Sequence, residues 1–194
     1  MFKEIELSKY KIDYSDSITI NNITVYRIIS LKDFDNGDVK KGQKGGFVES
    51  YLNLSFRGNS WIYDNAIACE HATVDSDAGI HNNVIISDYA RISDNANAYN
   101  HVKIYDHARV HGNALLHDHV KVHDYANVYG NAQIYDYADI ADQAEVYGYA
   151  RIRDHAKVRD YAKVSNDARV YDYTIVSGYD IIDTDSTKPP RRLV

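Results

Sequence analysis

The chain has 194 residues, a net charge of −6, one cysteine and two prolines. This length suits one domain, the single cysteine excludes an internal disulfide, and no apolar run is long enough for a transmembrane helix. The N-terminus, Met1-Phe2-Lys3-Glu4-Ile5-Glu6, is too charged for a secretory signal. We therefore expect a cytoplasmic protein with no membrane partner.

Residues 1–55 are predicted to form an N-terminal capping segment. Two β-prone runs, at 17–20 and 23–29, flank Asn21-Asn22, a pattern typical of a β-hairpin. Repeat folds need such a cap, because an open terminal repeat exposes the core. The pair Gly45-Gly46 lacks the Gly-Lys-Ser/Thr ending of a phosphate loop, and we interpret it as a turn.

Residues 56–182 repeat with a period of six. Every sixth residue from Ile62 to Val176 is aliphatic or Ala, with no insertion, and 18 of these 20 positions hold Ile, Val or Leu. Four residues after each of them, as far as Thr174, comes Ala, Val or Thr. On an α-helix, positions separated by four and then two residues do not share one face, so the pattern excludes a helix.

The third residue of each unit predicts a corner. It is nearly always Asp, Gly or Asn, which tolerate left-handed backbone angles. Each unit is therefore a short strand followed by a turn, and three units form a triangular coil of about 18 residues. Successive coils would pair as parallel strands about 4.8 Å apart, giving about 6–7 coils. Residues 183–194 are predicted to form a C-terminal tail, since Asp180 cannot enter a dry coil unpaired.

The unit [Ile/Val]-x-[Asp/Gly/Asn]-x-Ala-x resembles that of the hexapeptide-repeat left-handed β-helix superfamily, best known for acyltransferases, over about residues 56–180. The lead-in segments 41–50, 53–55 and 58–61 look like those of bacterial and prophage-borne hexapeptide-repeat proteins of unassigned function. The handedness is what the resemblance implies. The expected fold class is thus all-β, a left-handed parallel β-helix in the form of a triangular prism, with a small N-terminal β cap.

Because aliphatic side chains fill the interior, any binding must use the outward positions. The coil period places outward aromatic and His residues in columns, which either stabilise the stack or form a binding or self-association surface. We select candidate partner- or ligand-binding residues from two adjoining columns. They are Tyr99, His117, Tyr135 and Arg153 on a flat face, and His101, His119 and Tyr137 on the next corner.

Two polar columns raise the question of ions. Asp88 to Asp160 recur every 18 residues along one corner, where hydrogen bonds from each residue's own turn amides are favoured over a bound cation. The imidazoles of His101 and His119 are weak candidate Zn²⁺ or Ni²⁺ ligands. Their spacing follows automatically from the repeat, however, so we expect no metal and no cofactor.

The charge distribution bears on the partner. Residues 61–145 carry four basic and thirteen acidic side chains, net −9, whereas residues 146–194 carry nine basic and seven acidic, net +2. A nucleic-acid-binding protein normally presents a net basic surface, so we expect no nucleic-acid partner. The basic end could hold a small anionic ligand.

The sequence favours a non-enzymatic binding or scaffold protein that forms a homo-oligomer, a trimer or a dimer. The prophage-like lead-in implies an accessory or host-interference role in the host cytoplasm, with a host protein as partner. One alternative is a protein that sequesters a small ligand. The resemblance implies another alternative, a CoA-dependent acyltransferase with an inter-subunit His as general base. His117 is the candidate base, with His123, His111 and His81 as further possibilities.

Overall fold

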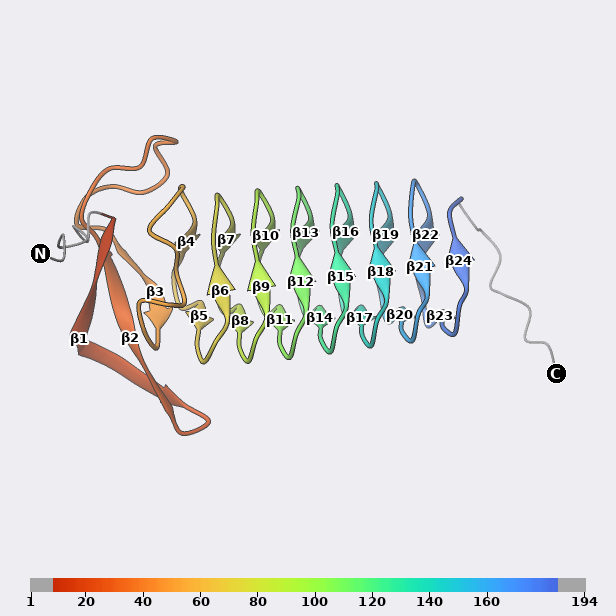
Figure 1. The fold of residues 1–194 in the computed structure, drawn as a ribbon, viewed down its shortest axis with the longest axis horizontal. Helices are drawn as coiled ribbons and strands as arrows, with labels where there is room; N and C mark the ends of the chain where they lie inside the picture. Colours follow the sequence, from red (N-terminus) through yellow and green to blue (C-terminus); the bar gives the residue numbers. More distant parts are fainter. Residues whose placement is uncertain (1–8, 185–194) are drawn as a thin grey trace, which may run out of the picture.

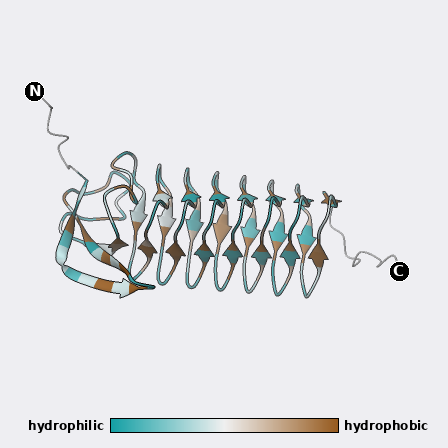
Figure 2. Ribbon diagram, turned by 60° about the horizontal axis from the view of Figure 1, so that its bottom comes forward, coloured by the Kyte–Doolittle hydropathy of each residue, from teal (hydrophilic) through white to brown (hydrophobic). Residues whose placement is uncertain are grey.

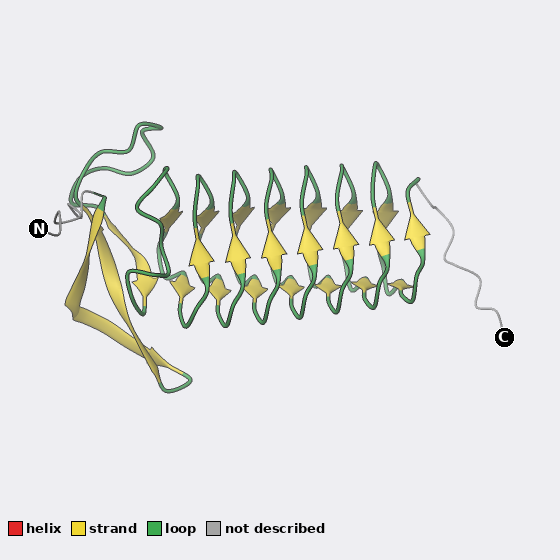
Figure 3. Cartoon of the chain, in the orientation of Figure 1, coloured by secondary structure: helices red, strands yellow, loops and turns green. Residues whose placement is uncertain are grey.

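The computed structural model describes residues 9–184, and all regular secondary structure within them is β-strand (Figure 3). Figure 1 shows a hairpin at one end of a straight stack of coils. The near strands point up, the chain crosses over the top to the far side, and each coil lies further to the right, so the winding is left-handed (Figures 1 and 3). The expected fold class, an all-β left-handed parallel β-helix with a β cap, is confirmed.

Three parallel sheets form the three faces of the prism. The first face consists of β4 (Trp61–Ile62), β7 (Gly79–Ile80), β10 (Asn97–Ala98), β13 (Leu115–Leu116), β16 (Gln133–Ile134), β19 (Arg151–Ile152) and β22 (Arg169–Val170). The second face consists of β5 (Ile67–Ala68), β8 (Ile85–Ile86), β11 (Lys103–Ile104), β14 (Lys121–Val122), β17 (Asp139–Ile140), β20 (Lys157–Val158) and β23 (Ile175–Val176). The third face consists of β6 (Thr73–Val74), β9 (Arg91–Ile92), β12 (Arg109–Val110), β15 (Asn127–Val128), β18 (Glu145–Val146), β21 (Lys163–Val164) and β24 (Ile181–Ile182).

The corners form at the positions that the sequence predicts. The third residue of every unit from Asp64 to Gly178 has a positive φ, between 53° and 71°. Most of these residues are Asp, Asn or Gly, which reach the left-handed region at the lowest cost. The turn residues therefore convert a six-residue period into a triangle.

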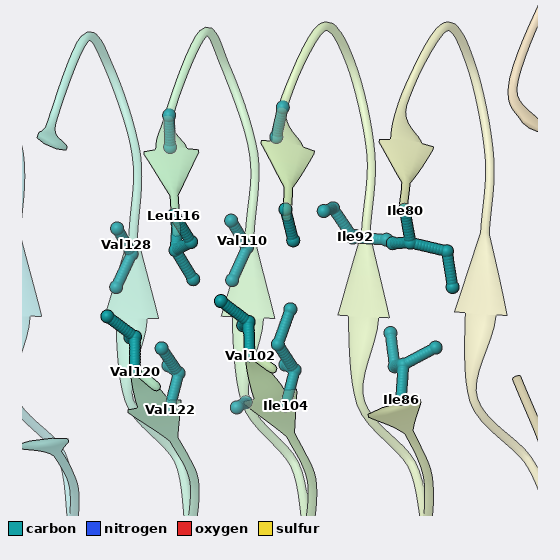
Figure 4. Close-up of a cluster of buried hydrophobic side chains, with 14 of the residues drawn as sticks. Ile80, Ile86, Ile92, Val102, Ile104, Val110, Leu116, Val120, Val122 and Val128 are labelled. Atoms are coloured by element: carbon teal, nitrogen blue, oxygen red, sulfur yellow. The ribbon is translucent and has the colours of Figure 1, made fainter. Parts of the chain in front are cut away.

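The interior is dry and filled by aliphatic side chains. Ile80, Ile104, Leu116 and Val128 are fully buried and belong to one core that extends along the prism (Figure 4). Most two-residue strands on the faces combine one outward residue with one buried residue, so their colour changes from hydrophilic to hydrophobic (Figure 2). Equivalent residues of neighbouring coils lie directly beside one another, because each strand pairs with the strand one coil away. Lys103, for example, pairs with Lys121.

The N-terminal hairpin extends the second face. Strands β1 (Tyr10–Ile20) and β2 (Ile23–Ser30) pair antiparallel, and the connecting Asn21 and Asn22 have φ of 46° and 67°. Strand β3 (Lys44–Val48) pairs antiparallel with β2 and parallel with β5. The predicted hairpin is therefore present, and β3 joins it to the stacked coils.

Aromatic side chains lie between the hairpin and the first coil. The Tyr10 ring stacks on Phe56 with centroids 4.8 Å apart, and Phe34 meets Trp61 edge-on at 5.2 Å. The Trp61 side chain is fully buried. These rings cover the first coil, which is the function expected of a cap.

Lys9 is buried beneath these rings. Its Nζ donates to the Ser55 carbonyl at 2.7 Å and to Ser60 Oγ at 3.0 Å. Burial, followed by the charge of Lys32, lowers the pKa of Lys9 to about 7. Lys9 thus ties the start of β1 to the loop that enters the first coil.

The interpretation of Gly45-Gly46 as a turn is wrong, since both residues lie inside β3. A Cβ on Gly45 would lie 2.7 Å from the Ile62 carbonyl, and one on Gly46 would lie 2.3 Å from the Ala66 carbonyl. Glycine is required here because the first coil passes directly against the strand.

The regular coil continues to β24, which pairs in parallel with β21. The backbone of Asp180 keeps the coil geometry, accepting the Lys163 N–H at 2.9 Å, while its side chain is exposed. This exposure removes the conflict that the sequence raises for Asp180. The part of the predicted tail that follows Thr184 lies outside the described residues.

The corner glycines allow a test of the stacking geometry. Both Gly130 and Gly178 have positive φ, 71° and 67°, but only a Cβ on Gly130 would approach the next coil, at 2.9 Å from the Gly148 nitrogen. We expect Gly178→Ala to cost about 1–2 kcal/mol from the left-handed backbone alone. Gly130→Ala should cost more, as measured by urea denaturation. Equal losses would contradict close contact between coils at this corner.

Candidate functional site

The outward rings form face-to-face columns along the prism. Centroids of stacked neighbours are between 4.1 and 5.1 Å apart, and their planes differ by at most 19°. This separation is close to the distance between paired strands. Each stacked pair contributes about 0.5–1.5 kcal/mol beyond its area of burial. The columns therefore stiffen the stack, whatever else they do.

The flat-face column brings Tyr99 and His117 into line with their neighbours. His81 lies between Tyr63 and Tyr99 at centroid distances of 4.1 and 4.3 Å, and His117 stacks on Tyr135 at 5.1 Å. Burial lowers the pKa of His81, against the opposing effects of the Asn97 side chain and of the charges of Asp64 and Asp38. Nearer the C-terminal end, the Arg153 guanidinium lies 5.1 Å from the centroid of its neighbour along the column, Tyr171.

The corner column joins the other three candidates. His101 stacks on His119 at 4.9 Å, and His119 stacks on Tyr137 at 4.8 Å. These three side chains line a shallow hollow together with Lys103 and Lys121. Sequence reasoning missed the two lysines, although a readable signal exists: each follows a candidate His by two residues, at the next outward position.

The outward side chains of the first face carry no charge over its first five strands. Charged groups do lie beside them, since burial and the charge of Asp38, in the loop before β3, raise the pKa values of Tyr63 and Tyr99, and Asp118 contacts His117. Neither outward position of β4, β7, β10, β13 or β16 carries Asp, Glu, Lys or Arg. These residues are Trp61, which rings of the capping segment cover, and Tyr63, Gly79, His81, Asn97, Tyr99, Leu115, His117, Gln133 and Tyr135. By contrast, the second face carries charges from Lys103 onward, and the third face from Asp75 onward.

The Asp column is stabilised by amides of the neighbouring coil. The backbone N–H of Asp106 donates to Asp88 Oδ2 at 3.3 Å, that of Asp124 to Asp106 Oδ2 at 3.2 Å, and that of Asp160 to Asp142 Oδ2 at 3.0 Å. The expectation that each residue's own turn supplies the amide is wrong. At the corner, the backbone N–H of each Asp points to the Asp carboxylate of the preceding coil. This hydrogen bond offsets the repulsion between the stacked carboxylates.

His117, the candidate general base, has an orienting partner. Its Nδ1 lies 2.6 Å from Asp118 Oδ2, and its side chain is 36% exposed. Burial raises the pKa of Asp118, but the hydrogen bonds from His117 and Asn100 outweigh it and hold that pKa below its usual range. Nε2 of His117 would be left to exchange a proton, which is the geometry that a general base requires.

The structure groups potential metal ligands at a place other than His101 and His119. Among the described residues, the ligand atoms of Asp106, His123 and Asp124 lie within 4.8 Å of one another. Both His123 nitrogens already meet carboxylates, Nδ1 with Asp124 at 2.8 Å and Nε2 with Asp139 at 2.9 Å. These contacts favour a protonated imidazole and account for the grouping without an ion.

No family model matches this chain, and no curated protein matches it significantly. Within residues 9–184, there is no helix long and apolar enough to cross a membrane. Function is therefore inferred from the geometry of the outer faces.

The His123 network predicts a pH-dependent stability. The hydrogen bond to Asp139 raises the pKa of His123 above 6.5 against the opposing effect of burial, and it lowers the pKa of Asp139. A raised pKa stabilises the fold below the unfolded-state pKa, and this stabilisation is lost as pH rises through the folded-state pKa. His123→Asn should therefore reduce the free energy of unfolding more at about pH 5 than at about pH 9.

His107→Asn is the matched control, because His107 stacks on Tyr89 and Tyr125 without a carboxylate partner in the described residues. Denaturant titrations at both pH values give the comparison. If the His123→Asn penalty is the same at both, the ion-paired network is absent.

Proposed function

We propose that this chain is a non-enzymatic binding and scaffold protein, similar to the hexapeptide-repeat β-helix proteins, that associates with copies of itself through its first face. The observation that carries this proposal is the uncharged stretch from Tyr63 to Tyr135 on a protein with net charge −6. Interface centres are depleted of charged residues and enriched in aromatic ones.

Desolvation distinguishes the three faces. Bringing two second faces together would bury the lysines at 103 and 121, and bringing two third faces together would bury Arg109 beside the ion-paired Arg91. Burying a charged group without a partner is costly. The first face presents Gly79, Asn97, Leu115 and Gln133 between its rings, none of which carries that cost.

The columns also lower the entropic cost of association. Rings that already stack at 4.1 and 4.3 Å, as around His81, have little rotamer freedom left to lose. A preorganised surface retains more of its contact energy as affinity. Stacked Tyr and His rings therefore suit lateral contact between two rigid prisms.

Sedimentation or light scattering should find a dimer or a trimer, and a charge on the first face should dissociate it. Leu115→Lys places an ammonium between Asn97 and Gln133, so we expect the mass to fall to that of a monomer. Asn127→Lys, at the equivalent strand position of the third face, should leave the oligomer unchanged. A monomeric wild-type protein would remove the association proposal.

A second candidate function, acyl transfer, is favoured by the contact between His117 and Asp118. If the protein is such an enzyme, it transfers the acetyl group of acetyl-CoA to a hydroxyl or amine and releases CoA as the thiol. His117→Ala should then abolish the reaction, at a cost in stability of about 0.5–1.5 kcal/mol from the lost stacking on Tyr135. The His117→Gln variant tests whether a side chain that still bonds Asp118 restores any rate. Transfer that survives in both variants would eliminate His117 as the base.

The prophage-like lead-in supports a role in the host cytoplasm, where the scaffold engages a host protein to interfere with its function. Affinity capture from the native host with the wild-type protein and with Tyr99→Ala tests this role. A partner that is retained by the wild-type protein and lost from the variant supports it. The capture of no specific partner argues for a self-contained scaffold.

A further inference from the structure

A hollow of about 390 Å³ lies where the corner column meets the second face, lined by His101, Lys103, His119, Lys121 and Tyr137. The two lysines are directly paired between β11 and β14. Like charges at directly opposite positions destabilise a sheet unless a group of opposite charge lies between them. All five side chains are exposed, and Tyr137 is 55% exposed.

The polar atoms of this hollow have no protein partner within the described residues. Among these residues, no hydrogen bond or ion pair involves either lysine ammonium, either imidazole or the Tyr137 hydroxyl, although the charge of Lys121 adds to the effect of His123 in lowering the pKa of Asp139. The nearby carboxylates are engaged elsewhere. Asp118 accepts from His117 and from Asn100 Nδ2 at 3.0 Å, and Asp139, next to Lys121 in the sheet, contacts His123 at 2.9 Å.

Two hollows of similar size lack this combination. One is lined by Tyr125, Asn127, Gln143 and Glu145 and contains no cation. In the other, Arg91 is paired with Asp75 and His111 contacts Asn127, which leaves one cation, the Arg109 guanidinium, without a hydrogen bond or ion pair among the described residues. Two directly paired ammonium groups beside hydrogen-bond donors therefore distinguish the hollow around Lys103 and Lys121, in the half of the prism that is net −9.

We propose that this hollow binds a phosphate group, either as a small phosphomonoester or as the free ion. A phosphate carries close to two negative charges at neutral pH and three strong acceptor oxygens, which matches two ammonium groups and several N–H and O–H donors. Strand spacing sets the two lysine stems about 4.8 Å apart, so both can reach one phosphate. The ring faces are occupied by stacking, so the ligand meets their polar edges. A phosphate group is then the ligand class that the protein would sequester. Binding at this hollow does not require association of the first faces.

Calorimetric titration at low salt with inorganic phosphate and glycerol 3-phosphate tests the proposal, with acetate as the comparison anion. We expect saturable binding of both phosphates and at least about tenfold weaker binding of acetate. Lys103→Gln/Lys121→Gln should weaken phosphate binding at least about tenfold. Lys157→Gln/Lys163→Gln removes the same charge elsewhere and should change it by less than about twofold.

His101→Phe/His119→Phe keeps the ring stack but removes the N–H donors, so it should weaken phosphate binding without lowering the unfolding temperature by a comparable amount. Tighter binding of the ester than of the free ion identifies an organic phosphate, and equal binding identifies the phosphate group alone; both support the site. Absence of saturable phosphate binding, equal affinity for acetate, or an equal loss in both lysine pairs would overturn it. None of these results depends on the oligomeric state.

Discussion

Hydrogen bonds between successive coils fix every other feature of this protein. The N–H of an outward residue donates to a carbonyl of the next coil, as Tyr99 does to Leu116 at 3.0 Å and Tyr135 to Ile152 at 3.0 Å. A spacing of about 4.8 Å follows, and it brings each residue into contact with its equivalents above and below. Inside, this leaves room only for aliphatic side chains and alanine. Outside, it turns single Tyr, His and Asp residues into continuous columns.

The six-residue period made the structure of the prism predictable. The capping segment has no such period, so its structure could not be predicted in the same detail. Residues such as Asp106 and Gly130 reveal the corners because few residue types tolerate positive φ there. No such rule applies before residue 56, and Gly45-Gly46 was misread because its constraint comes from the first coil lying against it rather than from its own conformation. The burial of Lys9 was equally hidden, since it depends on rings from three separate segments.

Within the candidate site, sequence placed the columns but not their electrostatics. That His101 and His119 stack follows from their spacing. That Asp118 orients His117, and that the corner carboxylates accept amides from the neighbouring coil, depends on side-chain directions that a repeat does not specify. The pairing of Lys103 with Lys121 was readable from the period, but its meaning required knowing which carboxylates nearby are already engaged.

The same architecture thus separates two surfaces on one rigid support, an uncharged aromatic face and a basic hollow around the corner from it. Both depend on an unbroken ladder of coils. Amide hydrogen exchange measures that ladder directly. The account predicts uniformly slow exchange for the outward N–H groups between Trp61 and Ser165, each of which bonds to the next coil, and faster exchange for those of the last coil. Rapid exchange in the middle coils would contradict it.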